Sequence, residues 1–102
     1  MDFQIGDSHM DPALLATLCQ KYGVRELSCF GSTARNQMRP DSDLDILVEF
    51  APDSEIDLID YAGLMLELTR LAGRSVDLVS KKGLKASIRD SVLSEARLLY
   101  AA

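Results

Sequence analysis

Two aspartates, Asp43 and Asp45, stand two residues apart at the start of a segment in which apolar residues alternate with others. This alternation predicts a strand, and residues two apart on a strand face the same way, with Cα atoms about 7 Å apart. Carboxylates at that spacing repel each other, and a bound divalent cation would offset the repulsion. The expected apolar face of this strand consists of Leu44, Ile46, Val48 and Phe50.

A glycine-serine pair, Gly31-Ser32, comes where an expected strand over residues 24–30 gives way to a short helix over residues 31–35. Glycine allows the backbone to approach a phosphate closely, and the N–H groups at a helix start attract anions. The Ser32 hydroxyl adds one more donor. If this strand is antiparallel to the one that follows Asp43, the glycine-serine turn and both aspartates meet at one end of the sheet.

A third carboxylate follows on another expected strand. Ser75 to Val79 alternates as a strand should, with Asp77 between Val76 and Leu78. A helix over about 57–72 connects it to the first aspartate strand, as a right-handed crossover would. Asp77 can therefore lie beside the first two aspartates.

The remaining patterns predict helices and turns. Asp11-Pro12 is a typical helix start, Gly23 a typical stop, and Pro40 marks a turn within residues 37–42. Ser54-x-x-Asp57 resembles a capping box before the 57–72 helix, which should end at Gly73. The expected core positions of the helix after Pro12 are Leu14, Leu15, Leu18 and Tyr22, and those of the 57–72 helix are Leu58, Tyr61, Ala62, Met65, Leu68 and Ala72.

The apolar arc of the 57–72 helix is wider than one face. Ile59, Leu64 and Leu66 extend it, which is expected of a partner surface or equally of a helix buried from two sides. A last amphipathic helix is expected from Leu84 onward, with its apolar positions at Leu84, Ile88, Val92, Ala96 and Leu99. The element order predicts a single small α/β domain with a short mixed three-stranded sheet flanked by helices.

Length and charge narrow the classes of function. The chain has 102 residues, enough for one domain, and a net charge of −5 leaves no basic surplus for direct nucleic-acid binding. It contains no apolar run of the roughly 20 residues that a membrane span needs. Cys19 and Cys29 are expected to be buried reduced thiols, which favours a cytoplasmic protein. Residues 1–9 are expected to be a disordered N-terminus or a cloning scar, and residues 10–102 the domain.

Other readings of the acidic segment are weaker. Asp41-x-Asp43-x-Asp45 resembles the opening of a calcium loop, but Ile46 stands where a glycine is needed. The ending of a P-loop is missing after Gly31. A solvated acidic strand end beside a capping serine remains the alternative without a function.

Together these residues resemble the DNA polymerase β-type nucleotidyltransferase superfamily, whose motif is Gly-Ser, ten residues, then Asp-x-Asp. Gly31-Ser32 and Asp43-Leu44-Asp45 fit it without a gap. From about Met10 onward the chain is most similar to the minimal nucleotidyltransferases, the antitoxins of HEPN/MNT toxin–antitoxin pairs. Asn36 departs from the glycine often found there.

The resemblance implies roles for six residues. Asp43 and Asp45 would hold two Mg²⁺ ions, and Asp77 would hold the catalytic ion and help to deprotonate the attacking hydroxyl. Gly31 and Ser32 would hold the β- and γ-phosphates of ATP. The remaining residue, Arg35, would contact a phosphate. The alternative for Arg35 is a surface ion pair with Asp41 or Asp43.

The resemblance also implies the partner. The chain would transfer AMP from ATP to a tyrosine of a HEPN ribonuclease toxin and so neutralise it, acting within a homo- or hetero-oligomer. Two alternatives remain open: an antitoxin that neutralises by binding alone, and the catalytic subunit of a small-molecule nucleotidyltransferase.

Overall fold

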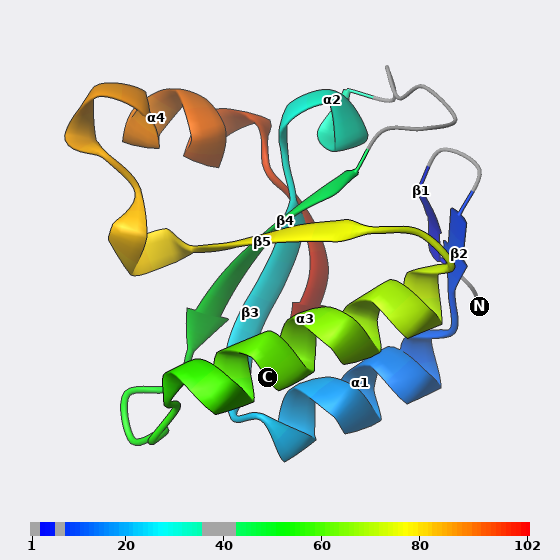
Figure 1. Ribbon diagram of the computed structural model, residues 1–102. Helices are drawn as coiled ribbons and strands as arrows, with labels where there is room; N and C mark the ends of the chain where they lie inside the picture. The colour runs from blue at the N-terminus through cyan, green and yellow to red at the C-terminus, as the bar shows by residue number, and fades with distance from the viewer. Residues whose placement is uncertain (1–2, 6–7, 36–42) are drawn as a thin grey trace.

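The computed structural model contains a four-stranded mixed sheet with helices on both faces (Figure 1). Its strand order is β5-β4-β3-β6; β4 and β5 run parallel, and the other neighbours run antiparallel. The structure describes residues 3–5, 8–35 and 43–102. The strands of this sheet are β3 (Val24–Cys29), β4 (Leu44–Phe50), β5 (Val76–Ser80) and β6 (Arg97–Ala101).

Two helices lie side by side along one face of the sheet, and two others lie toward the opposite side (Figure 1). The paired helices are α1 (Pro12–Lys21) and α3 (Leu58–Ala72), and the others are α2 (Gly31–Ala34) and α4 (Ala86–Glu95). A short 3₁₀ turn, η1 (Lys81–Gly83), leads into α4. A separate antiparallel ribbon joins β1 (Phe3–Ile5) to β2 (Ser8–Met10).

The hydrophobic core lies between the sheet and the α1–α3 layer. The predicted apolar face of β4 is confirmed at three positions that are fully buried, and α3 faces it with three buried side chains. Cys19 and Cys29 are buried free thiols in this core, as expected. The central members of the core are Leu15, Leu18, Leu27, Leu44, Ile46, Val48, Leu64, Leu68, Ala72, Val76 and Leu78.

The expected helix ends are confirmed where the sequence places a cap. The Asp11 side chain accepts a hydrogen bond of 2.8 Å from the Ala13 amide at the start of α1. Gly73 ends α3 with φ of +74°, in the left-handed region that glycine enters without steric cost. Both ends follow from local chemistry, which explains why the sequence predicts them.

The capping box of α3 lies three residues later than expected. Asp57 is the N-cap and accepts from the Asp60 amide at 2.8 Å, while the Asp60 carboxylate accepts from the Asp57 amide at 3.3 Å. The Ser54 hydroxyl instead donates to the Gly23 carbonyl at 2.8 Å. Ser54, which the sequence pattern assigns to the N-cap of α3, therefore makes a tertiary contact instead.

The expected core positions of the two long helices are only partly right. Leu14 on α1 is 57% exposed, and on α3 Leu58 is 83% exposed. Leu64, expected outside the main core stripe, is fully buried. The stripe rotates because the core side of α3 is set by where α1 and the sheet contact it, which helical spacing alone does not define.

The last expected helix is wrong beyond Glu95. α4 ends there, Ala96 caps it, and the following residues form β6 against β3. Leu99 is buried, but as a strand residue rather than a helical one. The sheet therefore has four strands instead of three, within the same α/β class.

Two sequence features discussed above fall in residues that the structure does not describe. The turn expected within residues 37–42, and Asn36, lie outside the described residues. Within the described ranges, every helix is too short or too polar to cross a bilayer.

Candidate active site

Asp45 and Asp77 are direct neighbours in the sheet. They are paired in register where β4 and β5 run parallel. Paired residues on neighbouring strands lie about 4.8 Å apart and direct their side chains to the same face. Asp43 precedes β4 by one residue and is exposed. The structure thus brings the third predicted carboxylate beside the first two.

The glycine-serine turn lies against the same strand position. Phe30, which precedes the turn, donates its amide to the Asp45 carbonyl at 3.0 Å. Gly31 has φ of +61°, and a Cβ atom added to it would lie 2.8 Å from Asp45 Oδ2. Glycine is required here both for the backbone conformation and for the close approach of the carboxylate. Ser32 follows as the second residue of α2 and is half-buried.

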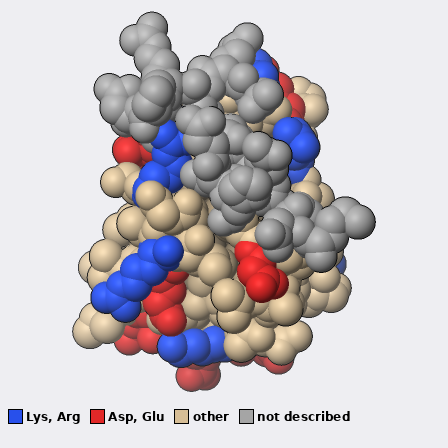
Figure 2. Space-filling view, turned by 90° about the vertical axis from the view of Figure 1, so that its right-hand side faces the viewer, with Lys and Arg blue, Asp and Glu red and all other residues tan. Residues whose placement is uncertain are grey.

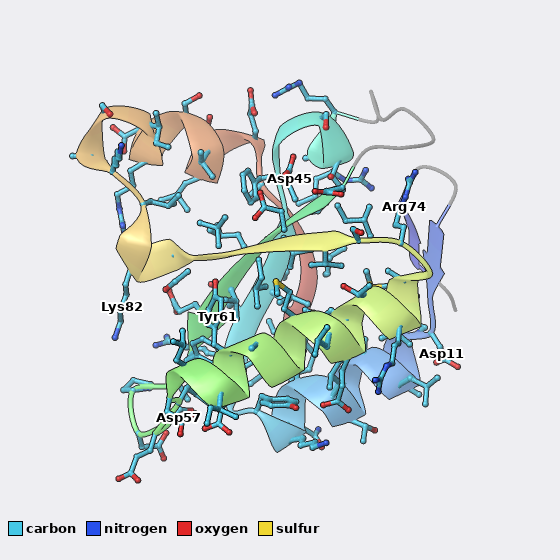
Figure 3. The ribbon with its side chains drawn as sticks, in the orientation of Figure 1. Asp11, Asp45, Asp57, Tyr61, Arg74 and Lys82 are labelled. Atoms are coloured by element: carbon cyan, nitrogen blue, oxygen red, sulfur yellow. The ribbon has the colours of Figure 1, made fainter. Side chains whose placement is uncertain are left out.

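A second hydrogen bond joins this turn to β4. The Asp45 amide donates to Thr33 Oγ1 at 2.9 Å, and Thr33 is 1% exposed. Thr33 is the buried polar residue of the described chain. Asp45 is therefore held through both its amide and its carbonyl, by residues on either side of Gly31 and Ser32. In Figure 3 the Asp45 side chain lies at the end of the sheet beside α2.

The electrostatics of the site favour a cation. Burial is the main factor that raises the pKa of Asp45, and the negative charges of Asp77 and Asp43 raise it further, while Arg35 opposes them. A cation placed among these carboxylates would relieve the same repulsion, and carboxylate oxygens are the ligands that Mg²⁺ prefers. The donor chemistry therefore fits a divalent metal.

The aspartate side chains of the site are not gathered around one metal position. Among the described residues, no three His, Cys, Asp or Glu side chains are gathered tightly enough to hold one ion as they stand. The strand register fixes the backbones of Asp45 and Asp77 as neighbours.

Arg35 connects the turn to α4. Its guanidinium forms an ion pair of 2.8 Å with Glu95, the last residue of α4. Its charge also acts on Asp45. The guanidinium therefore lies near both the carboxylates and the end of α4.

A cavity of about 290 Å³ continues along the same face of the sheet. Leu47, two residues after Asp45 on β4, lines it together with Leu93 of α4. At its rim Lys81 contacts Glu49 at 3.1 Å and Glu26 at 3.4 Å. The hydrogen bond to Glu49 is the main factor that raises the pKa of Lys81, which therefore stays protonated. The cavity therefore has apolar walls on the same face of the sheet as Asp45, but neither Asp45 nor Asp77 lines it.

Sequence reasoning missed Thr33, Glu95 and the Lys81 cluster. Thr33 lies within the predicted start of the short helix. Its hydroxyl is the only feature of the local sequence that indicates a hydrogen bond to another segment. The ion pairs Arg35–Glu95, Glu26–Lys81 and Glu49–Lys81 join residues that are 60, 55 and 32 positions apart in the chain. Nothing in a local pattern encodes such pairs.

Both charge signs occur on the surface of the described residues. On the face shown in Figure 2, basic and acidic side chains lie next to one another below the grey atoms. One such neighbouring pair in the fold is Lys21 and Glu67, whose charged atoms are 3.2 Å apart.

Comparison with known proteins places this geometry in a family. The model of the family described as "Nucleotidyltransferase domain" matches residues 12–99. The protein adenylyltransferase MntA of Thermococcus cleftensis is 44% identical over 79 residues, which are 76% of this chain and 77% of the relative.

Solved structures agree. A structure described as a minimal nucleotidyltransferase has a TM-score of 0.72 and 42% identity, over 84% of this chain and 86% of the other. A complex of tri-AMPylated Shewanella oneidensis HEPN toxin with MNT antitoxin has a TM-score of 0.62 and 20% identity, over 89% of this chain and 70% of its match. The latter similarity concerns the fold alone.

Proposed function

The chain belongs to the nucleotidyltransferase domain family, and from this premise we propose that it is a Mg²⁺-dependent protein adenylyltransferase that acts as an antitoxin. Its substrates are ATP and a tyrosine hydroxyl of a HEPN ribonuclease toxin. Support for the class of reaction comes from the relative named as a protein adenylyltransferase. The complex of an AMPylated HEPN toxin with an MNT antitoxin supports the partner.

The site residues divide the work in this proposal. Asp43, Asp45 and Asp77 would hold two Mg²⁺ ions, which would supply charge neutralisation of the triphosphate and a lowered pKa of the attacking hydroxyl. The N–H groups of the turn at Gly31 and Ser32 receive the β- and γ-phosphates.

The reaction is a nucleotidyl transfer. The tyrosine oxygen attacks the α-phosphorus and forms a new P–O bond, while the bond from that phosphorus to the β-phosphate oxygen breaks. Asp77 accepts the hydroxyl proton, and pyrophosphate leaves. Arg35 exchanges its contact with Glu95 for a phosphate oxygen. Preorganised charge of this kind is the main catalytic contribution in phosphoryl transfer.

The observation that carries the proposal is the register of Asp45 with Asp77 beside Gly31. Three different segments supply these residues, and a solvated acidic strand end would not need a buried threonine and a left-handed glycine to fix it. The cavity along Leu47 gives the nucleotide or the acceptor ring an apolar surface on the same face of the sheet as Asp45.

The test uses the purified chain with ATP, Mg²⁺ and the HEPN protein encoded beside it. Intact-mass spectrometry should show the toxin gaining the mass of AMP, and fragment spectra should place it on tyrosine. The pair Asp43→Ala and Asp45→Ala is the control and should transfer nothing. An unmodified toxin after incubation with the wild-type chain would refute the proposal.

A second candidate, neutralisation by binding alone, has one observation in its favour. Ile59 is 81% exposed and Leu66 is 55% exposed, so α3 presents apolar surface that could occlude a toxin. Co-expression separates the two functions. If the Asp43→Ala and Asp45→Ala chain still protects cells from the toxin, binding is sufficient; if protection is lost, catalysis is required.

The proposed reaction takes place in the cytoplasm. ATP is available there, and the buried thiols of Cys19 and Cys29 remain reduced. In this proposal the chain acts within an assembly with its toxin and does not bind nucleic acid directly.

A further inference from the structure

The outer side of α3 carries an apolar strip that nothing in the described chain covers. Leu58 is 83% exposed, Ile59 81% and Leu66 55%, and Ala62 between them is exposed. Leu58, Ala62 and Leu66 are four residues apart, so they share one side of the helix. The buried line of α3, formed by Leu64, Leu68 and Ala72, takes the core side. We call Leu58, Ile59, Ala62 and Leu66 the α3 strip.

A cavity of about 320 Å³ adjoins the first residue of the strip. Leu58, Phe50 and Tyr61 line it, together with Ile56, Asp57 and Ser80. The Tyr61 hydroxyl donates to the Leu78 carbonyl at 2.6 Å, and the rings of Phe50 and Tyr61 lie 6.2 Å apart. Two aromatic rings therefore line the cavity, and the hydrogen bond to Leu78 fixes the ring of Tyr61. Such a lining suits an apolar side chain inserted by a partner.

The approach to the strip is acidic. Asp53, Glu55 and Asp57 are exposed in the segment that leads into α3. Ser80 lines the far edge of the cavity; of the two lysines that follow it, Lys81 is bound to Glu26 and Glu49, and Lys82 is exposed. The balance at the Leu58 end of the strip is thus negative, whereas the exposed Arg70, four residues after Leu66, lies at its other end.

This charge decides between occupants. A second copy of the chain would bring an identical acidic edge against this one, and like charges across an interface oppose association. A protein that binds and cuts RNA must instead present basic side chains, because it neutralises phosphates. Such a surface, with an apolar centre flanked by Lys or Arg, complements the α3 strip in both respects.

We propose that the α3 strip and its acidic edge, Asp53 and Glu55, are the docking surface for the HEPN toxin. This inference rests on the proposed function, which names that partner. The strip is remote from the chemistry: Asp45 and Phe50 stand five residues apart on β4, about 17 Å at the rise of a strand. Figure 3 shows Asp57 at the opposite end of the molecule from Asp45.

Remote docking makes a distinct kinetic prediction. Leu58→Gln with Ile59→Gln should raise both the Kd for the toxin and the KM for toxin in AMP transfer by 10-fold or more. The kcat at saturating toxin should stay within twofold, because Asp45 and Asp77 are untouched. Asp53→Lys with Glu55→Lys should weaken binding and reduce its dependence on salt.

Matched controls come from other exposed apolar residues. Leu14→Gln on α1, 57% exposed, and Ile88→Gln on α4, 47% exposed, remove similar side chains elsewhere and should leave Kd and KM unchanged. All variants replace exposed residues, and thermal unfolding checks that each is folded. Calorimetric titration with the toxin encoded beside this chain gives Kd without requiring transfer.

The outcomes separate this inference from the proposed function. Unchanged Kd and KM in the Leu58→Gln, Ile59→Gln chain overturn the docking surface, whether or not AMP is transferred. A wild-type dimer that this variant dissolves, with toxin affinity unchanged, assigns the strip to a second copy and also overturns it. If the wild-type chain transfers no AMP but the variant loses toxin affinity, the docking surface stands and the proposed function fails.

Discussion

The buried hydroxyl of Thr33 accepts a hydrogen bond from the amide of Asp45 at 2.9 Å. This single contact ties the turn after β3 to the carboxylate-bearing start of β4, 12 residues further along the chain. Together with the bond from the Phe30 amide to the Asp45 carbonyl, it fixes the backbone of Asp45 from both sides. The distance between the turn and the carboxylates is therefore set by the fold before any ligand binds.

Thr33→Val should leave the protein folded but impair catalysis. Valine has nearly the same shape, but it leaves the Asp45 amide without its acceptor, which costs about 1–3 kcal/mol of stability. Displacement of Asp45 should lower kcat by roughly 10- to 100-fold. Thr33→Ser keeps the hydroxyl and should recover most of kcat. Equal kcat values for the Val and Ser variants would show that the bond has only a structural role.

Asp45→Asn should abolish AMP transfer and stabilise the metal-free chain at neutral pH. Because the pKa of Asp45 is raised, the folded state binds a proton more tightly than the unfolded chain does. Stability therefore falls as the pH rises from the ordinary pKa through the raised one, and the ionised carboxylate is unfavourable above it. Melting temperatures in EDTA should be higher for the variant at pH 7, and the difference should shrink as the pH is lowered. Added Mg²⁺ should raise the melting temperature of the wild-type chain more than that of the variant.

Gly31→Ala should lose activity, whereas Gly73→Ala should not. Both glycines have positive φ, so alanine at either position costs about 1–2 kcal/mol in backbone strain. Only at Gly31 would the new Cβ meet a carboxylate, 2.8 Å from Asp45 Oδ2; at Gly73 no atom of the described residues other than its own chain neighbours lies within 4 Å of it. Denaturant unfolding should show similar losses of stability, and AMP transfer should separate the two. Full activity of Gly31→Ala would mean that Asp45 yields without consequence.

Cys19 and Cys29 should resist alkylation in the folded chain. Burial raises the pKa of Cys19 to about 12 and is also the main factor that raises the pKa of Cys29. At pH 8 both therefore remain thiols, which are poor nucleophiles. Iodoacetamide followed by mass spectrometry should find neither modified in buffer and both modified in denaturant. Rapid labelling of Cys19 in buffer would indicate that α1 opens readily.

Removal of a core side chain and of a strip side chain should differ sharply. Leu64→Ala creates a cavity between α3 and the sheet and should cost about 2–5 kcal/mol. Leu58→Ala removes an 83% exposed side chain and should change stability by less than about 0.5 kcal/mol. Urea unfolding measures both. A large loss for Leu58→Ala would mean that the strip is covered within the chain itself.

The comparison of sequence and structure shows which information is local. Asp11 and Gly73 mark helix ends because capping depends on one side chain or one backbone angle. The alternation around Asp45 predicts its strand and its facing, because a strand repeats every two residues. The β6 strand was missed, since Leu99 fits a helical spacing equally well and only the open edge of β3 selects the extended form.

For the site, local sequence patterns supply the residues: three aspartates, a glycine-serine turn and an arginine, with Asp45 and Asp77 on strands as expected and Asp43 one residue before its strand. Tertiary structure alone decided that Asp77 pairs in register with Asp45, that Thr33 holds Asp45, and that Leu64 rather than Leu58 enters the core. The reason is physical. Local patterns record the period and the caps of an element, whereas register and facing between elements depend on side chains far apart in the chain, whose packing is settled only when the whole domain closes.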